Sequence, residues 1–130
     1  MKAILTGSQV YGKPTKNSDI DIVLLADTDQ LAKLARLADK KKGDEYNGDD
    51  VNLVFGKLNI IGTTSETRFD TWLEGTNLLK DMFYHTGDPI SKATAIKVFE
   101  SHGIRQVGKN KKVTIAWQDA EDHSIIHQVV

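Results

Sequence analysis

Short hydrophobic runs alternate with polar, turn-forming segments over the first part of the chain. Ala3 to Leu5 has the character of a buried strand, and the following Thr6-Gly7-Ser8 predicts a turn out of it. From residue 19 to residue 25 an apolar side chain occupies every second position, which predicts a strand. Because successive side chains of a strand point to opposite faces, Asp19 and Asp21 are predicted to share one face.

Three later segments have apolar residues at helical spacing. The first runs from Asp29 to about Lys42, with Lys40-Lys41-Lys42 in its last turn and Gly43 as its end. The second begins near Ser65 and runs to about Phe83, and Gly75-Thr76-Asn77 predicts a break or kink within it. Its Trp72 is expected in the core rather than as a platform for a stacked base. The third runs from Lys92 to about His102, with Ser91 as its cap.

Further strands are predicted on both sides of these helices. Val51 to Phe55 and Leu58 to Ile61 are strand-like, and Gly56-Lys57 between them favours a hairpin. Residues 105–117 suggest a second hairpin, and residues 124–130 one more strand. Open edges in this C-terminal segment would allow packing on the core, binding of a partner, or a homo-oligomer through the C-terminal strands.

The elements together predict an α+β fold, a short mixed sheet with two or three packed helices. With 130 residues the chain is long enough for one domain with a real core. We assign residues 1–86 to the core and residues 87–130 to a C-terminal extension of the same domain, consisting of a helix and a β-hairpin. No apolar run approaches the length of a membrane span, and we expect a cytoplasmic protein with no membrane association.

Charge and composition narrow the function classes. The chain has 17 Lys and Arg against 18 Asp and Glu, a net charge of −1. Nucleic acid therefore remains a possible partner that the charge does not indicate, and a processive polymerase is disfavoured. The absence of cysteine excludes disulfides, thiolate zinc sites and cysteine nucleophiles together. His123 and His127 have the spacing of zinc ligands only in a helix, which their neighbours disfavour.

The paired acids point to a metal site. Two carboxylates on one strand face repel each other, and a hard divalent cation held with a substrate phosphate would explain them. We therefore predict Mg²⁺ (or Mn²⁺) bound by Asp19 and Asp21. Gly7 lets the backbone approach a phosphate closely, and Ser8 offers a hydroxyl to it.

The segment between the glycine and the acids supplies further candidates for nucleotide binding. Residues 9–12 predict a single helical turn whose amides face a phosphate, which adds Tyr11 to the set. Residues 13–18 are a loop, in which Lys16 could reach a phosphate and Ser18 precedes the first acid. Lysines in an exposed loop are also commonly just solvated.

Gly7-Ser8, ten further residues, and then Asp19-Ile20-Asp21-Ile22 form a recognisable combination, with Gly12 between the two parts. This combination resembles the nucleotidyltransferases of the DNA polymerase β superfamily, above all the small minimal members, which include phage-encoded domains. The resemblance is sharp from Leu5 to Leu25 and extends to about Lys80. It implies transfer of a nucleoside monophosphate from an NTP substrate to an acceptor, with Asp19 and Asp21 as catalytic residues.

The chain departs from the superfamily pattern at the third carboxylate, which binds metal and acts as a base on a later strand. The two candidate strands read Val51-Asn52-Leu53 and Leu58-Asn59-Ile60, each with asparagine where an acid is expected. Asn52 or Asn59 can offer an oxygen to a metal but cannot accept a proton. Asp49, Asp50 or Glu66 are candidates to compensate, Asp50 only with a shift of strand register.

Two function hypotheses follow. One is a metal-dependent nucleotidyltransferase whose acceptor is a small molecule, a protein or a nucleic acid, for instance a phosphate or carboxylate that needs little deprotonation. The other is a catalytically degenerate relative that binds nucleotide or a protein partner, in a regulatory, antitoxin-like or host-interaction role. Loss of the third acid favours the second, and the retained Asp19, Asp21 and Gly7-Ser8 favour the first.

Overall fold

The computed structural model describes residues 1–43 and 50–104. The predicted C-terminal hairpin and the strand after it, and with them any homo-oligomer built on those strands, lie outside the described residues. The elements in chain order are β1 (Lys2–Thr6), α1 (Ser8–Tyr11), β2 (Ile20–Leu25), α2 (Thr28–Leu37), β3 (Lys40–Gly43), β4 (Asp50–Phe55), β5 (Leu58–Thr63), α3 (Glu66–Thr86) and α4 (Lys92–Ser101).

The described strands form one mixed sheet of five, in the order β1-β2-β5-β4-β3. β2 pairs antiparallel with β1 on one side and parallel with β5 on the other. β4 pairs antiparallel with both β5 and β3, and Gly56 with a φ of 60° makes the predicted hairpin between β4 and β5. The predicted α+β fold is confirmed, and β2, which begins directly after Asp19 and contains Asp21, lies inside the sheet.

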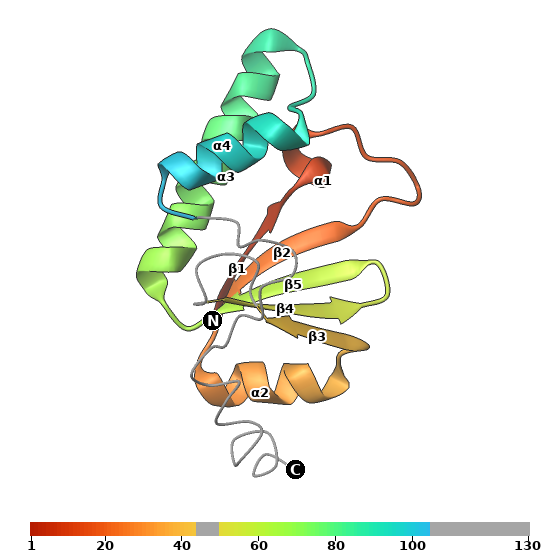
Figure 1. Cartoon of the computed structure of the whole chain (residues 1–130), viewed down its shortest axis with the longest axis vertical. Helices are drawn as coiled ribbons and strands as arrows, with labels where there is room; N and C mark the ends of the chain where they lie inside the picture. The colour runs from red at the N-terminus through yellow and green to blue at the C-terminus, as the bar shows by residue number, and fades with distance from the viewer. Residues whose placement is uncertain (44–49, 105–130) are drawn as a thin grey trace.

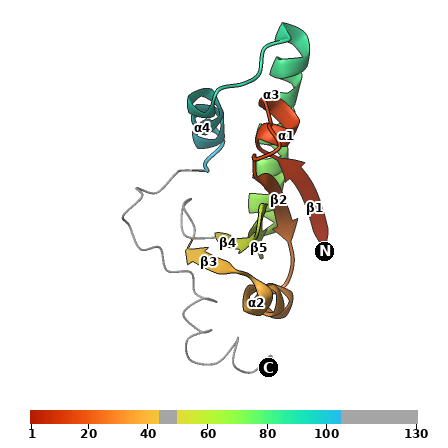
Figure 2. The same ribbon diagram turned by 90° about the vertical axis from the view of Figure 1, so that its right-hand side faces the viewer.

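Each face of the sheet has its own hydrophobic core. Leu24, Leu31 and Leu53 belong to the core beneath α2, and Val23, Trp72 and Phe99 belong to the core under α1, α3 and α4. Figure 1 shows α2 and the α3–α4 pair on opposite sides of the strands, and Figure 2 shows the same arrangement from the side. Neighbouring residues of β2 such as Val23 and Leu24 therefore pack into different hydrophobic cores, as expected from side chains that alternate between the two faces of a strand.

The prediction that Lys40-Lys41-Lys42 is the last turn of a helix is wrong, because α2 ends at Leu37 and these residues open β3. Leu37 is 76% exposed, so the apolar face of the helix has already ended there. The next residues bind β4 instead: the Asp39 amide donates to the Val54 carbonyl at 2.7 Å, and the Asp39 carboxylate accepts from the Gly56 amide. Pairing with a distant strand outweighs the local helical pattern.

The predicted break at Gly75-Thr76-Asn77 is also wrong, since α3 is continuous through it. A Cβ on Gly75 would lie 2.6 Å from Cε1 of Phe99, so this glycine lets α4 approach α3 closely. The helix starts follow the predicted chemistry: the side chains of Ser65 and Ser91 each accept a hydrogen bond from a backbone amide of the first turn. Among the described residues, no helix is long and apolar enough to cross a membrane.

Candidate functional site

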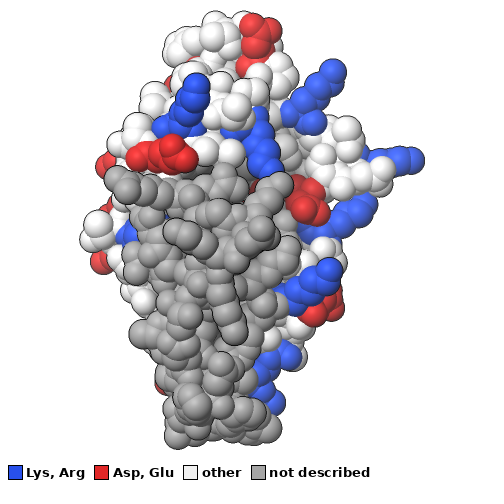
Figure 3. All heavy atoms as spheres, in the orientation of Figure 1, with Lys and Arg blue, Asp and Glu red and all other residues white. Residues whose placement is uncertain are grey.

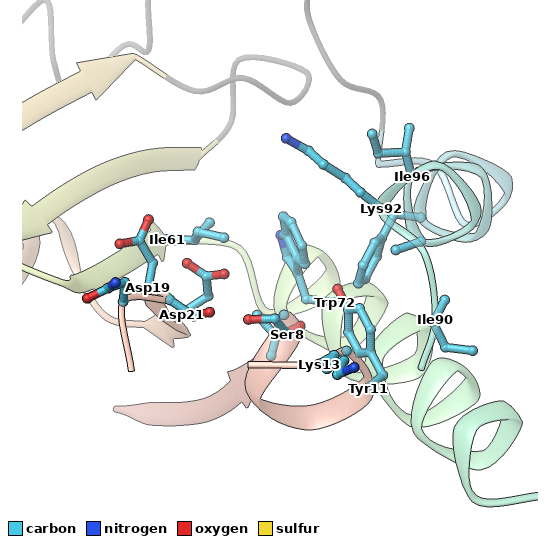
Figure 4. Close-up of a pocket in the computed structure, with 17 residues that line it drawn as sticks. Ser8, Tyr11, Lys13, Asp19, Asp21, Ile61, Trp72, Ile90, Lys92 and Ile96 are labelled. Carbon is cyan, nitrogen blue, oxygen red and sulfur yellow. The ribbon is translucent and has the colours of Figure 1, made fainter. Parts of the chain in front are cut away.

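Three strands meet at the two acids. Asp19 immediately precedes β2, and Asp21 is its second residue, paired with Thr6 of β1 and with Asn59 of β5. The Asn59 side-chain amide donates to Asp19 Oδ2 at 3.2 Å and to Asp21 Oδ1 at 3.1 Å. Both carboxylates therefore face one point above the sheet, where Figure 4 shows them side by side.

Gly7 lies directly against this pair. Its φ of 73° and ψ of −158° belong to a region of backbone space that is essentially restricted to glycine. A Cβ at this position would overlap Oδ2 of Asp21 and lie 3.2 Å from its Cγ. The turn from β1 into α1 thus brings bare backbone against the carboxylate. The close approach to a phosphate that the sequence predicts for Gly7 stays a prediction.

The environment of Asp21 disfavours its charge. Burial raises the pKa of Asp21 above the ordinary value of 3.8, the charge of Asp19 raises it further, and the hydrogen bond from Asn59 lowers it. The charged form of this carboxylate is thus held at a cost unless an opposite charge lies beside it. A cation bound between the acids would remove that cost, because it supplies the opposite charge that the site lacks.

A cavity of about 520 Å³ opens beside the acids. Its polar end is lined by Gly7, Ser8, Ser18, Asp19 and Asp21, so five of the predicted site residues come together there. Its other end is apolar and includes Trp72 of α3 and Ile96 of α4. The volume is in the range of small-ligand sites, about 300–1,000 Å³. Figure 4 shows Ser8 and the two acids on one side and Ile90 and Ile96 on the other.

Tyr11 also lines the cavity but is largely buried in the core. Burial raises the pKa of Tyr11, the hydrogen bond to the Thr6 side chain lowers it, and the charge of Asp21 raises it. The Thr6 hydroxyl is in turn hydrogen-bonded to the Thr76 hydroxyl at 2.7 Å, within the core. Tyr11 therefore ties α1 to β1 and α3, and fixes the turn that carries Gly7 and Ser8.

Three predicted site residues, Lys16, Asn52 and Asn59, are not among those that line the cavity. Lys16 is not among the lining residues; it is exposed, and its carbonyl accepts a hydrogen bond from Lys57 Nζ at 2.7 Å. Asn52 is on the same face of the sheet as the acids, but it belongs to β4, one strand farther from them than Asn59. There it pairs with Ile61 of β5. Within the described part of the chain its buried Oδ1 has no hydrogen-bond partner. Of the two asparagines, only Asn59 touches the acids.

No third carboxylate joins the pair: in residues 1–43 and 50–104, no three His, Cys, Asp or Glu side chains cluster. Asp50 is fully buried and accepts hydrogen bonds from Arg68 and from the Trp72 indole N–H. Glu66 pairs with Lys2, at the opposite end of β1 from the acids. Asp49 lies outside the described residues.

The donor set fits a hard divalent cation. Asp19 and Asp21 supply carboxylate oxygens, and rotation of the Asn59 amide would supply a neutral oxygen in place of the amide hydrogens that now bridge the acids. Oxygen-only sets of this kind suit Mg²⁺ or Mn²⁺. With two negative charges rather than three, the site is a weaker one than a full set of carboxylates would make.

The sequence pattern did not identify the far wall of the cavity. Lys92, Ala95, Ile96 and Phe99 of α4 line it, together with Trp72. Helical spacing predicts that the apolar face of α4 is buried, but the spacing carries no information about its partner. The tilted contact between Trp72 and Phe99, with ring centroids 4.8 Å apart, shows that α4 packs over α3 beside the acids.

Electrostatics around the site are mixed. On the face seen in Figure 3, acidic side chains lie among the basic ones rather than leaving a single basic patch. Lys13 and Lys92 line the same cavity as the two acids, so it carries positive as well as negative charge. The described charges around the cavity are therefore of both signs.

A comparison with protein families agrees with this geometry. The model of the nucleotidyltransferase domain matches residues 1–77, more than half of the chain. No curated protein and no solved structure matched. The matched span contains Gly7, the two acids and Asn59 and ends within α3, before α4. The chain therefore belongs to the nucleotidyltransferase domain family, as a minimal member of the DNA polymerase β superfamily.

Proposed function

We propose that the protein is a metal-dependent nucleotidyltransferase that transfers a nucleoside monophosphate from an NTP to an acceptor. The convergence of Asp19, Asp21 and the bare backbone of Gly7 at one end of the cavity carries this proposal. Acids on one face favour a cation, and a glycine turn with a serine beside it favours a phosphate. Mg²⁺ or Mn²⁺ bound by Asp19 and Asp21 would neutralise phosphate charge and polarise the phosphoryl oxygens.

The chain's own groups position the substrate. Ser8 and the backbone at Gly7 would bind the outer phosphates, and the α-phosphate would lie beside Asp19 and Asp21. An acceptor oxygen then forms a bond to the α-phosphorus in line with the leaving group. The bond from the α-phosphorus to the bridging oxygen breaks, and pyrophosphate leaves with that electron pair.

The amide at position 59 narrows the range of acceptors. Asn59 occupies the position beside Asp21 where a third acid would lie, and an amide cannot take up a proton. We therefore infer that the acceptor reacts as an anion, for instance a phosphate or a carboxylate. A hydroxyl acceptor would lack general-base assistance, which typically contributes about a hundred- to ten-thousand-fold in rate.

Asn59 also favours the second candidate function, a relative that binds nucleotide and regulates a partner without transferring the nucleotide. Its amide donates to both acids, so the acids have a neutral hydrogen-bond partner of the chain's own in the place where a third carboxylate is expected. Labelled NTPs with Mg²⁺ or Mn²⁺ and a panel of phosphate, carboxylate and hydroxyl acceptors separate the two functions. Pyrophosphate release that depends on Asp19 supports transfer, whereas binding without release supports the regulatory function.

Calorimetry with Mg²⁺ and each NTP tests the site that both functions share. The Asp19→Asn, Asp21→Asn double variant should lose Mg²⁺-dependent binding by at least about a hundredfold, because both charged ligands are removed. Asp29→Asn, an exposed acid in the first turn of α2, is the matched control and should bind as the unaltered protein does. Unchanged affinity in the double variant would overturn the proposed function.

A further inference from the structure

The geometry of an in-line displacement restricts where the acceptor lies. The attacking oxygen approaches the α-phosphorus from the side opposite to the leaving pyrophosphate. In the proposed function the outer phosphates lie at Gly7 and Ser8, directly after β1. The α-phosphate lies beside Asp19 and Asp21, where β2 begins. Because the sheet has the order β1-β2-β5, the acceptor belongs on the β5 side of the two acids.

The residues of β5 on the face that carries the acids are uncharged at this place. Asn59 occupies the position beside Asp21, and Ile61, the next residue on the same face, lines the cavity. In the view of Figure 4, Ile61 and Ser8 lie on opposite sides of Asp21. A carboxylate at position 59 would repel an anionic acceptor, whereas the amide of Asn59 does not. The β5 side of the cavity therefore admits an acceptor that carries negative charge.

Lys92 brings positive charge into the cavity from α4. Among the described residues, the cations that line the cavity are Lys13 and Lys92. Lys13 follows α1 closely in sequence, and in Figure 4 it lies on the same side of Trp72 as Ser8. Lys92 instead extends from α4 over Trp72, toward the side on which Ile61 lies. The two lysines thus enter the cavity from different sides.

Hydrogen bonds hold the start of α4 in place. The Ile90 amide donates to the Tyr11 carbonyl at 2.7 Å, which ties the segment before α4 to α1. The Ser91 side chain accepts from the Thr94 amide and fixes the first turn of the helix. Lys92 follows directly and is exposed, and within the described part of the chain it forms no ion pair. Its charge is therefore available to a ligand in the cavity.

On the basis of the proposed function, we propose that Lys92 binds an anionic acceptor on the β5 side of the acids and selects it over a hydroxyl acceptor. An oxygen of this phosphate or carboxylate forms the bond to the α-phosphorus, and pyrophosphate leaves with the electron pair of the broken bond. Such an acceptor has no proton to lose, which agrees with the amide at Asn59. α4 lies beyond residues 1–77, which match the family model, so this selection is assigned to a helix outside the matched domain.

Three small acceptors test the charge preference in the presence of Mg²⁺ and NTP: inorganic phosphate, acetate and glycerol. Transfer to phosphate yields a nucleoside diphosphate, and radiolabelled orthophosphate enters its β-position only through this reaction. Pyrophosphate release that depends on added acetate or glycerol reports the other two. The unaltered protein should use one of the anions at least about tenfold faster than glycerol, because glycerol lacks general-base assistance. The anion that reacts identifies the acceptor as a phosphate or a carboxylate.

Substitutions of lysine test the assignment of Lys92. Lys92→Gln should raise the KM for the preferred anion about tenfold, while kcat and the KM for NTP change less than about twofold. Lys92→Arg should retain most of the affinity, because it keeps the charge. Lys97→Gln is the matched control, since Lys97 is an exposed lysine of the same helix that does not line the cavity. Lys13→Gln removes the other cation and should leave the KM for the anion unchanged. Circular dichroism and thermal melting check that each variant remains folded.

The remaining outcomes separate this inference from the proposed function. An unchanged KM for the anion in folded Lys92→Gln, or an equal rise in Lys97→Gln or Lys13→Gln, would overturn the role of Lys92 alone. A rise only in the KM for NTP would do the same, because it would place Lys92 at the nucleotide. Preferred transfer to glycerol, or transfer to none of the three probes, would overturn the anionic acceptor site. Loss of Mg²⁺-dependent NTP binding from the unaltered protein's expected properties, measured by calorimetry, would overturn the proposed function as well.

Discussion

The Cα of Gly7 faces the carboxylate of Asp21 so closely that no side chain fits between them. The pairing of Thr6 with Asp21 fixes this relationship, because it brings the end of β1 beside the start of β2. The glycine turn and the acid are therefore one structural unit rather than two motifs that happen to be close. A substitution at either residue should therefore displace the other.

Gly7→Ala should damage both stability and binding. The positive φ and the overlap with Asp21 should lower the free energy of unfolding by about 1–3 kcal/mol, measured by urea denaturation. Calorimetry should show that Mg²⁺-dependent NTP binding is lost, because the acid must move. Gly56→Ala is the control, with a φ of 60° and no atom within 4 Å of the added Cβ. It should lose about 1–2 kcal/mol and keep its NTP affinity.

Asn59→Asp should strengthen the metal site. A third carboxylate beside Asp21 should raise Mg²⁺ affinity about tenfold in calorimetry, because affinity increases with the number of charged ligands. If transfer to hydroxyl acceptors lacks only a base, the same variant should accelerate it by on the order of a hundredfold. Asn52→Asp adds the same charge on the same face, opposite Ile61, and should leave Mg²⁺ affinity unchanged. A larger gain with Asn52→Asp would place the third ligand there instead.

The two asparagines show where sequence patterns stop being informative. Alternation along one strand is a local property, so the common face of Asp19 and Asp21 is predictable from residues 19 to 25 alone. Which asparagine lies beside them depends on the register between β2 and β5, which pair in parallel across a long stretch of chain. Asn52 and Asn59 have nearly the same neighbours in sequence, and only this long-range register separates them.

The positions of β3 and α4 also depend on contacts between distant segments of the chain. Residues 38 to 42 continue an apparent helical pattern, but the exposed edge of β4 binds that backbone as a strand. The buried face of α4 is predictable from its spacing, while its position over the acids follows from the Trp72–Phe99 contact and from the close approach at Gly75. Such contacts between distant segments are not encoded in any local period.

Asp21→Asn should stabilise the protein at neutral pH when a chelator removes divalent ions. The pKa of Asp21 is raised in the folded state, so folding favours the protonated carboxyl, and the carboxylate costs stability above that pKa. The variant should therefore melt at a higher temperature near neutral pH. The gain should disappear as the pH falls below 3.8, the ordinary value, where both states are protonated.

Melting curves of Asp21→Asn and of the control Asp29→Asn, recorded over a range of pH, check this prediction. Asp29 is exposed on α2, and its substitution should shift the melting temperature little at any pH. A stabilisation of Asp21→Asn that persists at acidic pH would contradict the assigned cause. With added Mg²⁺ at neutral pH, the unaltered protein should instead melt at a higher temperature than Asp21→Asn, because only the carboxylate binds the ion well.

Asp50→Ala should be strongly destabilising although Asp50 is distant from the cation site. Its side chain is fully buried and paired with Arg68, whose side chain is only 12% exposed. Removing the acid leaves a buried guanidinium and the Trp72 N–H without that partner, at a cost of about 3–5 kcal/mol in urea denaturation. Asp50→Ala combined with Arg68→Met should recover part of that loss.

The exposed pair Lys2 and Glu66 is the natural comparison. Its side chains are 57% and 69% exposed, and Lys2→Ala should cost at most about 1 kcal/mol. A similar small loss in Asp50→Ala would show that the buried pair does not hold α3 against the sheet.

The place of β2 between β1 and β5 has a consequence for how the molecule assembles. β1 is its neighbour in sequence and can join it early, but β5 follows only after α2, β3 and β4 have been synthesised. Contacts of such large sequence separation form late, since a long loop must close first. The nascent chain thus brings Asn59 beside Asp19 and Asp21 only with the last strand of the described sheet. If these residues bind a cation as proposed, cation affinity during refolding should report completion of this sheet.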